Sequence, residues 1–323
     1  MIGDFQLKNI EAICNSYVSV KEITPIDAGV SSYTYQIKAK EGVFYFSTLV
    51  KEYKKKKLSP RMLLLSHIAK MGMVVPNPVA YKDFDTELEN YSWALVTEVL
   101  GKALLEMSPL DLRVLKDAGA DLAKLHTISA DGFGYVREFG TEGKPIGEDP
   151  SYSYHLMESL RYKAPFSDKL DVLKKFNLLK EKEIYAIVDF IDSNKKYIEI
   201  EHGVLMHGDY SKDHIFYKNN KYSGVIDWDG IGVGTGIYDL AQFSIQNTKK
   251  ELDALLEGYL IDSKYKDDSE FRERLFIEEL LFVIPKLAKI KIKEASGQRY
   301  MDNSMSGITL NNFERVIKRF RRD

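Results

Sequence analysis

The residue pattern changes near residue 100, and this change constrains the fold more than any other feature. Before it, short apolar and β-branched runs predict strands. These strands are expected at residues 33–38, 43–50 and 93–100. One helix is expected among them, with Ser59 as its N-cap, Pro60 in its first turn and Gly72 after its end. After the change, apolar residues recur at helical spacing. The sequence therefore predicts an α+β chain with a small β-rich lobe, residues 1–100, and a larger, mainly helical lobe, residues 101–323.

The helical lobe is expected to contain four long helices and one β-rich island. The first helix should have Ser108 as its N-cap and Asp111 as the acid of a capping box. The other three helices are expected at residues 177–193, 251–260 and 269–293. Pro285 should kink or divide the last of them. The glycine-rich segment 132–150 is expected to be a surface loop, and the β-rich island covers residues 204–229.

Composition excludes several classes of protein. The chain has 46 basic and 48 acidic residues, so its overall charge gives no reason to expect nucleic acid or an anionic membrane as a partner. The single cysteine, Cys14, cannot form an intramolecular disulfide or a structural zinc cluster. Residues 1–17 lack the pattern of a signal peptide, and no window approaches the length of a transmembrane helix. We therefore expect a cytoplasmic protein without a membrane-spanning segment, and its oligomeric state stays open.

The β-rich island carries acids and histidines around one predicted hairpin. A polar loop with Asp209 follows the first apolar strand, and a second strand begins after His214. Residues 219–220 have the composition of a turn, and the returning strand leads to Asp227. Antiparallel pairing should bring His214 and Asp227 to the same end of the hairpin.

These side chains suit two chemical roles. His214 and Asp227 could hold a divalent cation, whereas Asp209 could accept or orient the proton of an attacking hydroxyl. Each residue alone could also cap a turn or satisfy a core hydrogen bond. A hydrophobic hairpin has no structural need for so many acids and imidazoles at one end, so we favour a functional site.

This stretch resembles the catalytic core of the aminoglycoside phosphotransferase family, part of the protein-kinase-like fold. The resemblance rests on His207-Gly208-Asp209, then His214, then Ile226-Asp227-Trp228. The segment Tyr238-Asp239-Leu240-Ala241 is similar to the family's Asp-Leu-Ala segment, in which the acid anchors a helix. The end of the helix 122–126 and Gly132-Phe133-Gly134 are also similar to the family, which implies a structural role for His126.

The resemblance implies transfer of the γ-phosphate of GTP or ATP to a hydroxyl of a small molecule, with Mg²⁺ as cofactor. Asp209 and Ser211 would be the catalytic residues, and His214 and Asp227 the metal ligands. Most members have asparagine in place of His214. Histidine there is similar to the aminoglycoside 2''-phosphotransferases and macrolide 2'-phosphotransferases, which often use GTP well. The implied acceptor is an aminoglycoside-like or related antibiotic, an amino alcohol or a sugar, and antibiotic resistance is one candidate role.

The resemblance extends to the first lobe. The loop 29–32 resembles the family's phosphate-covering loop, and the segment 95–101 resembles the hinge that binds the purine edge through backbone groups. The nucleotide-binding residues would be Ser31, Ser32, Lys51, Thr97 and Val99. The family pairs its strand lysine with a glutamate on the next helix, but the segment 60–71 contains no acid that could pair with Lys51.

Two other functions stay open at this point. One is a metal-dependent hydrolase that binds zinc or manganese. Its ligands would be His207, Asp209, His214 and Asp227. The other is a pseudokinase, a nucleotide-binding or partner-binding module without transfer, which would explain the missing helix acid. For a cationic acceptor of the phosphotransferase, Glu278, Glu279 and Asp229 could form an acidic patch.

Overall fold

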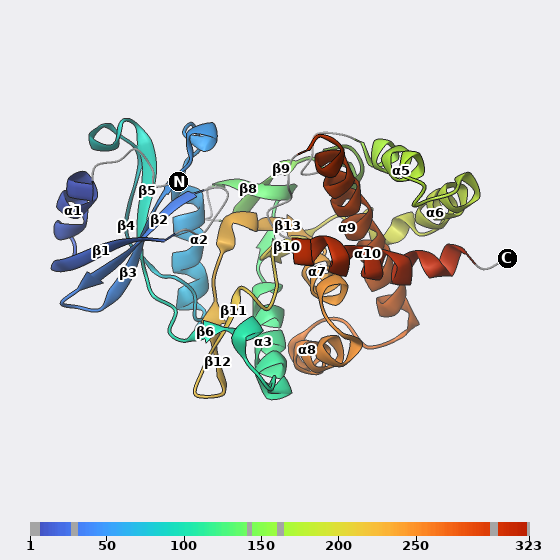
Figure 1. The fold of residues 1–323 in the computed structure, drawn as a ribbon. Helices are drawn as coiled ribbons and strands as arrows, with labels where there is room; N and C mark the ends of the chain where they lie inside the picture. The colour runs from blue at the N-terminus through green and yellow to red at the C-terminus, as the bar shows by residue number, and fades with distance from the viewer. Residues whose placement is uncertain (1–6, 27–31, 141–143, 160–164, 298–302, 322–323) are drawn as a thin grey trace. The chain divides into compact units, whose positions relative to one another are not determined.

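The computed structural model describes residues 7–26, 32–140, 144–159, 165–297 and 303–321. The chain divides by packing into two units, and its elements are labelled in Figure 1. The first unit consists of Met1–Ser108 and Lys212–Asp229, and the second of Pro109–Ser211 and Gly230–Asp323. None of the helices in the described residues is long and apolar enough to cross a membrane.

An antiparallel five-stranded sheet, in the order β1-β2-β3-β5-β4, forms the framework of the first unit. The strands are β1 (Val20–Ile26), β2 (Ser32–Ala39), β3 (Val43–Leu49), β4 (Pro78–Asp85) and β5 (Tyr91–Thr97). The helix α1 (Leu7–Asn15) contributes Ile10 and Cys14 to a core that includes Phe46 and Trp93 of the sheet, whose rings stack with centroids 5.5 Å apart. The three strands expected from the sequence are confirmed as β2, β3 and β5.

The helix α2 (Ser59–Lys70) is capped from a distance. Ser59 is its first residue and Leu58 occupies the N-cap position, so the expectation that Ser59 is the N-cap was wrong. Asp83 of β4 supplies the cap. Its carboxylate accepts hydrogen bonds from the backbone N–H groups of Leu58 (2.7 Å) and Ser59 (3.2 Å) and from the Ser59 hydroxyl (2.5 Å). A tertiary partner thus replaces the local cap.

The predicted hairpin is present. It consists of β11 (Ile215–Lys218) and β12 (Lys221–Val225), and with β6 (Lys102–Ala103) it forms a three-stranded sheet in the order β12-β11-β6. Asn219 and Asn220 form the turn with φ of 52° and 58°, the left-handed conformation that a two-residue type I′ turn requires. The sequence-based boundary at residue 100 grouped the hairpin with the helical lobe, whereas packing groups it with the first unit.

The second unit is mainly helical around a small sheet. Its long helices are α3 (Leu112–Leu125), α5 (Phe166–Lys175), α6 (Glu181–Ser193), α7 (Ile237–Gln246), α8 (Lys249–Asp262), α9 (Ser269–Ala295) and α10 (Asn303–Ile317). The sheet has the order β7-β10-β13-β8-β9. Its strands are β7 (Ser129–Ala130), β8 (Phe133–Phe139), β9 (Pro145–Asp149), β10 (Gly203–Met206) and β13 (Gly232–Gly234).

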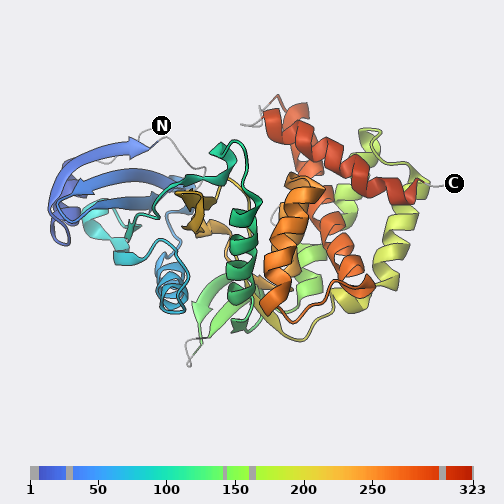
Figure 2. The ribbon, with the colours of Figure 1, turned by 90° about the horizontal axis from the view of Figure 1, so that it is seen from below.

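The helices α3 and α8 lie side by side in both views (Figures 1 and 2). Two glycines allow this approach. A Cβ atom at Gly119 would lie 2.0 Å from the Leu255 carbonyl oxygen, and one at Gly258 would lie 1.8 Å from the Lys116 carbonyl oxygen. The two backbones are therefore in direct contact.

Several expectations for the second unit need correction. The N-cap of α3 is Asp111, which accepts a hydrogen bond from the Arg113 N–H (3.0 Å), rather than Ser108. The segment 132–150 is not a loop, because β8 and β9 pair within it and glycines allow close backbone contact. The three other expected helices are confirmed as α6, α8 and α9, although α6 begins only at Glu181. Pro285 lies inside α9 without dividing it.

Candidate active site

One buried carboxylate fixes the loop that carries Asp209. Asp239, in the first turn of α7, accepts hydrogen bonds from the backbone N–H groups of His207 (2.7 Å) and Gly208 (2.8 Å). The Nε2 atom of His126 lies 3.1 Å from the same carboxylate. Burial alone would raise the pKa of Asp239, but the hydrogen bonds and the nearby histidines outweigh it and hold the pKa below its usual value. Asp239 and His126 therefore have the structural roles that the resemblance implies.

The Asp209 carboxylate is itself oriented. Its Oδ1 atom accepts a hydrogen bond from the Gln242 side chain (2.5 Å), and its backbone N–H donates to Nδ1 of the buried His207 (3.2 Å). Asp209 is half-buried, whereas Ser211 is buried. A fixed carboxylate with partial access to solvent can accept a proton from a bound hydroxyl. Sequence reasoning missed Gln242, although it lies one helical turn after Asp239.

The hairpin of the first unit brings His214 and Asp227 together. The Ile226 N–H donates to the His214 carbonyl oxygen (2.9 Å), and the Nε2 atom of His214 lies 3.4 Å from Oδ2 of Asp227. Asp227 has a φ of 60°, a left-handed conformation that non-glycine residues adopt with strain. The two side chains are 18% and 45% exposed, respectively. One nitrogen and one oxygen donor at this spacing fit a divalent cation.

A basic residue that sequence reasoning did not single out lies close to this pair. Arg61, in the first turn of α2, forms an ion pair with Asp229. Burial lowers the pKa of Arg61 to about 10 despite the opposing charge of Asp227, so Arg61 remains charged at neutral pH. The Asp229 N–H also donates to Oδ1 of Asp227 (3.4 Å). Asp229 is thus engaged by a cation of the chain itself.

The expected acidic patch is not on the surface. Glu278 and Glu279 are only 1% and 7% exposed, because both lie on the buried side of α9. Glu278 accepts hydrogen bonds from the hydroxyl groups of Tyr152 (3.0 Å) and Thr235 (2.7 Å). The expectation that these two acids face an acceptor was wrong, because helical periodicity did not distinguish the buried side of this helix from the exposed one.

Of the three proposed phosphate-binding residues, the structure describes Ser32 and Lys51. Ser31 is outside the described residues, and Ser32 is the first residue of β2. Lys51 lies in a short 3₁₀ turn after β3, and its side chain is exposed.

The proposed hinge follows β5. The Thr97 N–H donates to the Asn77 carbonyl oxygen (2.9 Å), and its hydroxyl accepts from the Asn77 N–H (3.0 Å). This amide is therefore engaged within the lobe, and a purine would have to approach the Thr97 carbonyl. Val99 is buried and lies close to the Gly224 backbone of the hairpin.

Solved structures with the same fold are aminoglycoside phosphotransferases and a related kinase. The ternary complex of a thermostable mutant of aminoglycoside phosphotransferase APH(4)-Ia with ADP and hygromycin B has a TM-score of 0.67 at 12% identity and covers 97% of this chain and 99% of that one. The GDP complex of aminoglycoside 2'-phosphotransferase-IIIa has a TM-score of 0.64 at 14% identity, covering 97% and 98%. A putative fructosamine-3-kinase from Haemophilus somnus 129PT has a TM-score of 0.60 at 13% identity, covering 98% and 96%. No curated protein sequence matches the chain.

The fold expected from the sequence is confirmed: a two-lobed α+β protein of the protein-kinase-like class. Its enzymatic class is that of a small-molecule phosphotransferase. Residues 22–275 match the model of the phosphotransferase enzyme family, and the chain belongs to this family.

Proposed function

We propose that the chain transfers the γ-phosphate of GTP or ATP to a hydroxyl of an aminoglycoside-like compound, an amino alcohol or a sugar. The observation that carries the proposal is the Asp209 carboxylate, oriented by Gln242 on a loop that the buried Asp239 holds. Structures with the same fold bind ADP with hygromycin B, or GDP, which supports a purine nucleotide as donor. Phosphoryl transfer mainly requires that both substrates are positioned and that developing charge is stabilised.

Two sets of side chains have separate roles in this proposal. Asp209, with Ser211 in the same loop, acts on the acceptor hydroxyl by accepting or orienting its proton. His214 and Asp227 would hold Mg²⁺, which neutralises charge on the nucleotide phosphates. Residues 1–100 would bind the nucleotide and residues 101–323 the acceptor.

The remaining nucleotide contacts are proposed because their segments resemble the phosphate-covering loop, the strand lysine and the hinge of the family. They are Ser31 and Ser32 at the phosphates, Lys51 as a phosphate ligand, and backbone groups of Thr97 and Val99 at the purine. A reducing compartment such as the cytoplasm fits the single buried thiol of Cys14.

A pseudokinase is the second candidate, and α2 is the observation that favours it. The family pairs its strand lysine with a glutamate on the following helix, whereas residues 60–71 contain no acid and Arg61 pairs with Asp229. Binding of nucleotide without transfer to any hydroxyl would favour this alternative. The hydrolase is less well supported, because His207 is fully buried and its Nδ1 atom accepts the Asp209 N–H.

Two substitutions test the proposed function. Asp209→Asn should lower turnover by about a hundredfold or more while it leaves nucleotide binding intact, because it removes the proton acceptor. Asp227→Asn should abolish the part of nucleotide affinity that depends on Mg²⁺, measured by calorimetry with and without the metal. Asp189→Asn, on the exposed side of α6, is the matched control.

The same measurements decide between the alternatives. Wild-type turnover in Asp209→Asn would remove Asp209 from the mechanism, and undiminished metal-dependent binding in Asp227→Asn would remove the metal assignment. A thermal shift with zinc or manganese alone, and none with magnesium and either nucleotide, would favour the hydrolase. This comparison also ranks GTP against ATP, because a ligand that binds only the folded state raises its stability.

A further inference from the structure

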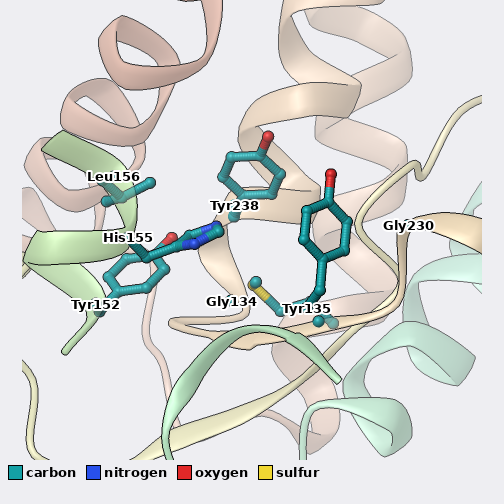
Figure 3. A pocket seen from close by; sticks show the side chains of 9 residues that line it. Gly134, Tyr135, Tyr152, His155, Leu156, Gly230 and Tyr238 are labelled. Carbon is teal, nitrogen blue, oxygen red and sulfur yellow. The ribbon is translucent and has the colours of Figure 1, made fainter. Parts of the chain in front are cut away.

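A hollow in the second unit is too small to bind an acceptor. Figure 3 shows the aromatic side chains around it, which are Tyr135, Tyr152, His155 and Tyr238. Nδ1 of His155 lies 2.6 Å from Oδ2 of Asp149, and a Cβ atom at Gly134 would lie 2.7 Å from each of these two atoms. The hollow has a volume of about 10 Å³, which is room for about one water molecule. The first unit, in contrast, has an arginine next to the proposed metal ligands.

The sheet of the first unit contributes little positive charge to a phosphate site. A nucleoside triphosphate carries several negative charges, and a metal ion offsets only part of them, so a cationic side chain is needed beside the metal. The strand β3 (Val43–Leu49) contains only apolar, aromatic and hydroxyl side chains. Lys38 of β2 and Lys82 of β4 are each paired with an acid of the same sheet. Lys51 lies beyond the end of β3 and is exposed.

Arg61 is held near the end of the hairpin by contacts on both sides of α2. Asp83 of β4 caps the helix and thereby fixes its first turn, in which Arg61 lies. After the helix, the Val74 carbonyl oxygen accepts a hydrogen bond from the Val225 N–H (3.1 Å). Val225 is the last residue of β12, and Asp227 follows two positions later. The helix that carries Arg61 is thus joined to the strand that leads to the proposed metal ligand.

The Arg61 head group lies beside two acids. It forms an ion pair with Asp229, and the two side chains are only 23% and 31% exposed. The charge of Asp227 also favours the guanidinium cation, which persists at neutral pH despite its burial. A guanidinium has more N–H donors than one carboxylate can accept, and its planar shape also fits phosphate oxygens. Arg61 can therefore bind a further anion while it is paired with Asp229.

We propose that Arg61 binds a phosphate group of the donor nucleotide, beside the metal ion that His214 and Asp227 would hold. The inference rests on the proposed function and adds a phosphate ligand to it. Because phosphate oxygens coordinate the metal in phosphotransferase sites, phosphates bound there lie next to Asp227 and therefore next to Arg61. Asp229 orients the guanidinium and, as an anion, also competes with phosphate for it.

Isothermal titration calorimetry of the full chain with ATP and with GTP, each with magnesium, tests this role. Arg61→Gln should weaken the nucleotide that the wild type prefers by about tenfold or more, because hydrogen bonds from a charged group are lost. Arg61→Lys should retain part of the affinity, since it keeps the charge but not the planar set of donors. Asp229→Asn should bind at least as tightly as wild type, because it leaves Arg61 in place and removes the competing anion. Arg272→Gln, which breaks a surface pair with Asp267 in the second unit, is the matched control and should bind normally.

Other results would overturn the inference. Wild-type affinity in Arg61→Gln would exclude Arg61 from phosphate binding, and equal losses in Arg61→Gln and Asp229→Asn would show that the arginine acts only through the ion pair. An equal loss in Arg272→Gln would show that the effect is not specific to the site. Thermal unfolding without ligand identifies any variant that does not fold. If Arg61→Gln is one of them, Arg61→Lys must still bind more weakly than Asp229→Asn. No binding of either nucleotide by the wild-type chain refutes the proposed function, whereas normal binding in Arg61→Gln refutes only this inference.

Discussion

Two buried acids of the second unit show how surroundings decide the charge of a residue. Asp239 faces His126 and two backbone N–H groups, and its pKa is lowered although burial acts in the opposite direction. Glu278 accepts hydrogen bonds from the hydroxyl groups of Tyr152 and Thr235, and burial raises its pKa to about 7 despite them. Asp239 is therefore ionised at neutral pH and can hold the loop as an anion. Ionisation of Glu278 near neutral pH instead destabilises the fold.

Replacing Glu278 with Gln should remove a pH dependence of stability. Because Glu278 has a pKa of 4.5 when unfolded and about 7 when folded, its contribution is complete below pH 4.5 and is lost as the pH rises through 7. The free energy of unfolding of Glu278→Gln relative to wild type should therefore rise by about 3 kcal/mol between pH 4.5 and 7.5. Urea unfolding across this range measures it. A difference that stays constant with pH would contradict the assignment, and the exposed Glu199→Gln serves as control.

Single residues of the site were predictable only where the relevant contacts are local. His214 and Asp227 could be placed together because a short turn fixes the register between them. Arg61 could not be placed beside Asp229, because no local pattern links residues so far apart in the sequence. The same reason hid the contact of Asp149 with Gly134, although the glycine motif itself was visible.

At the scale of elements, the predicted strands and helices are present, whereas two predicted N-caps and the loop predicted at residues 132–150 were wrong. Periodicity predicted three strands of the first sheet and four long helices of the second unit, but the cap of α2 comes from Asp83 on a distant strand. The segment 132–150 has the composition of a loop and forms β8 and β9, because its glycines permit strand contacts that larger residues would block. A glycine-rich composition is compatible with either a loop or a strand, and pairing with other parts of the chain determines which one forms.

The Asn-Asn turn offers a test of the hairpin. Both residues have positive φ, so Asn220→Val should destabilise the protein by about 1–2 kcal/mol, whereas Asn220→Gly should be neutral or slightly stabilising. Chemical denaturation measures both, with the exposed strand substitution Lys218→Thr as a control. Equal stability of the valine and glycine variants would exclude a left-handed turn at this position.

For the whole molecule, the sequence predicted two lobes but not how the chain is divided between them. The hairpin is encoded within the helical half and packs with the first unit through hydrogen bonds. Three of them are Val225 N–H to Val74 O (3.1 Å), Leu105 N–H to Lys212 O (3.1 Å) and Ser223 Oγ to Leu100 O (2.6 Å), and β11 also pairs with β6. Contacts between residues far apart in the sequence do not alter the local composition. The change of pattern near residue 100 therefore could not show that the hairpin belongs to the first unit.

A fragment experiment tests this division. Residues 1–108 alone should be less stable than residues 1–108 joined by a short glycine-serine linker to 212–229. Loss of these three hydrogen bonds, at roughly 1 kcal/mol each, and of the pairing between β6 and β11 predicts a difference of at least about 3 kcal/mol. Thermal and urea unfolding of the two fragments measure it. If both unfold at the same midpoint, the hairpin does not stabilise the first unit.

The divided chain also restricts how relatives of this protein can exchange parts. Since the first unit comprises two separate stretches of sequence, a single crossover between two genes would combine a sheet from one parent with a hairpin from the other. Transfer of the complete first unit requires junctions near residues 108, 211 and 229 at once. Exchange of a whole unit between relatives should therefore be rare, and the sheet of the first unit should be inherited together with its own hairpin.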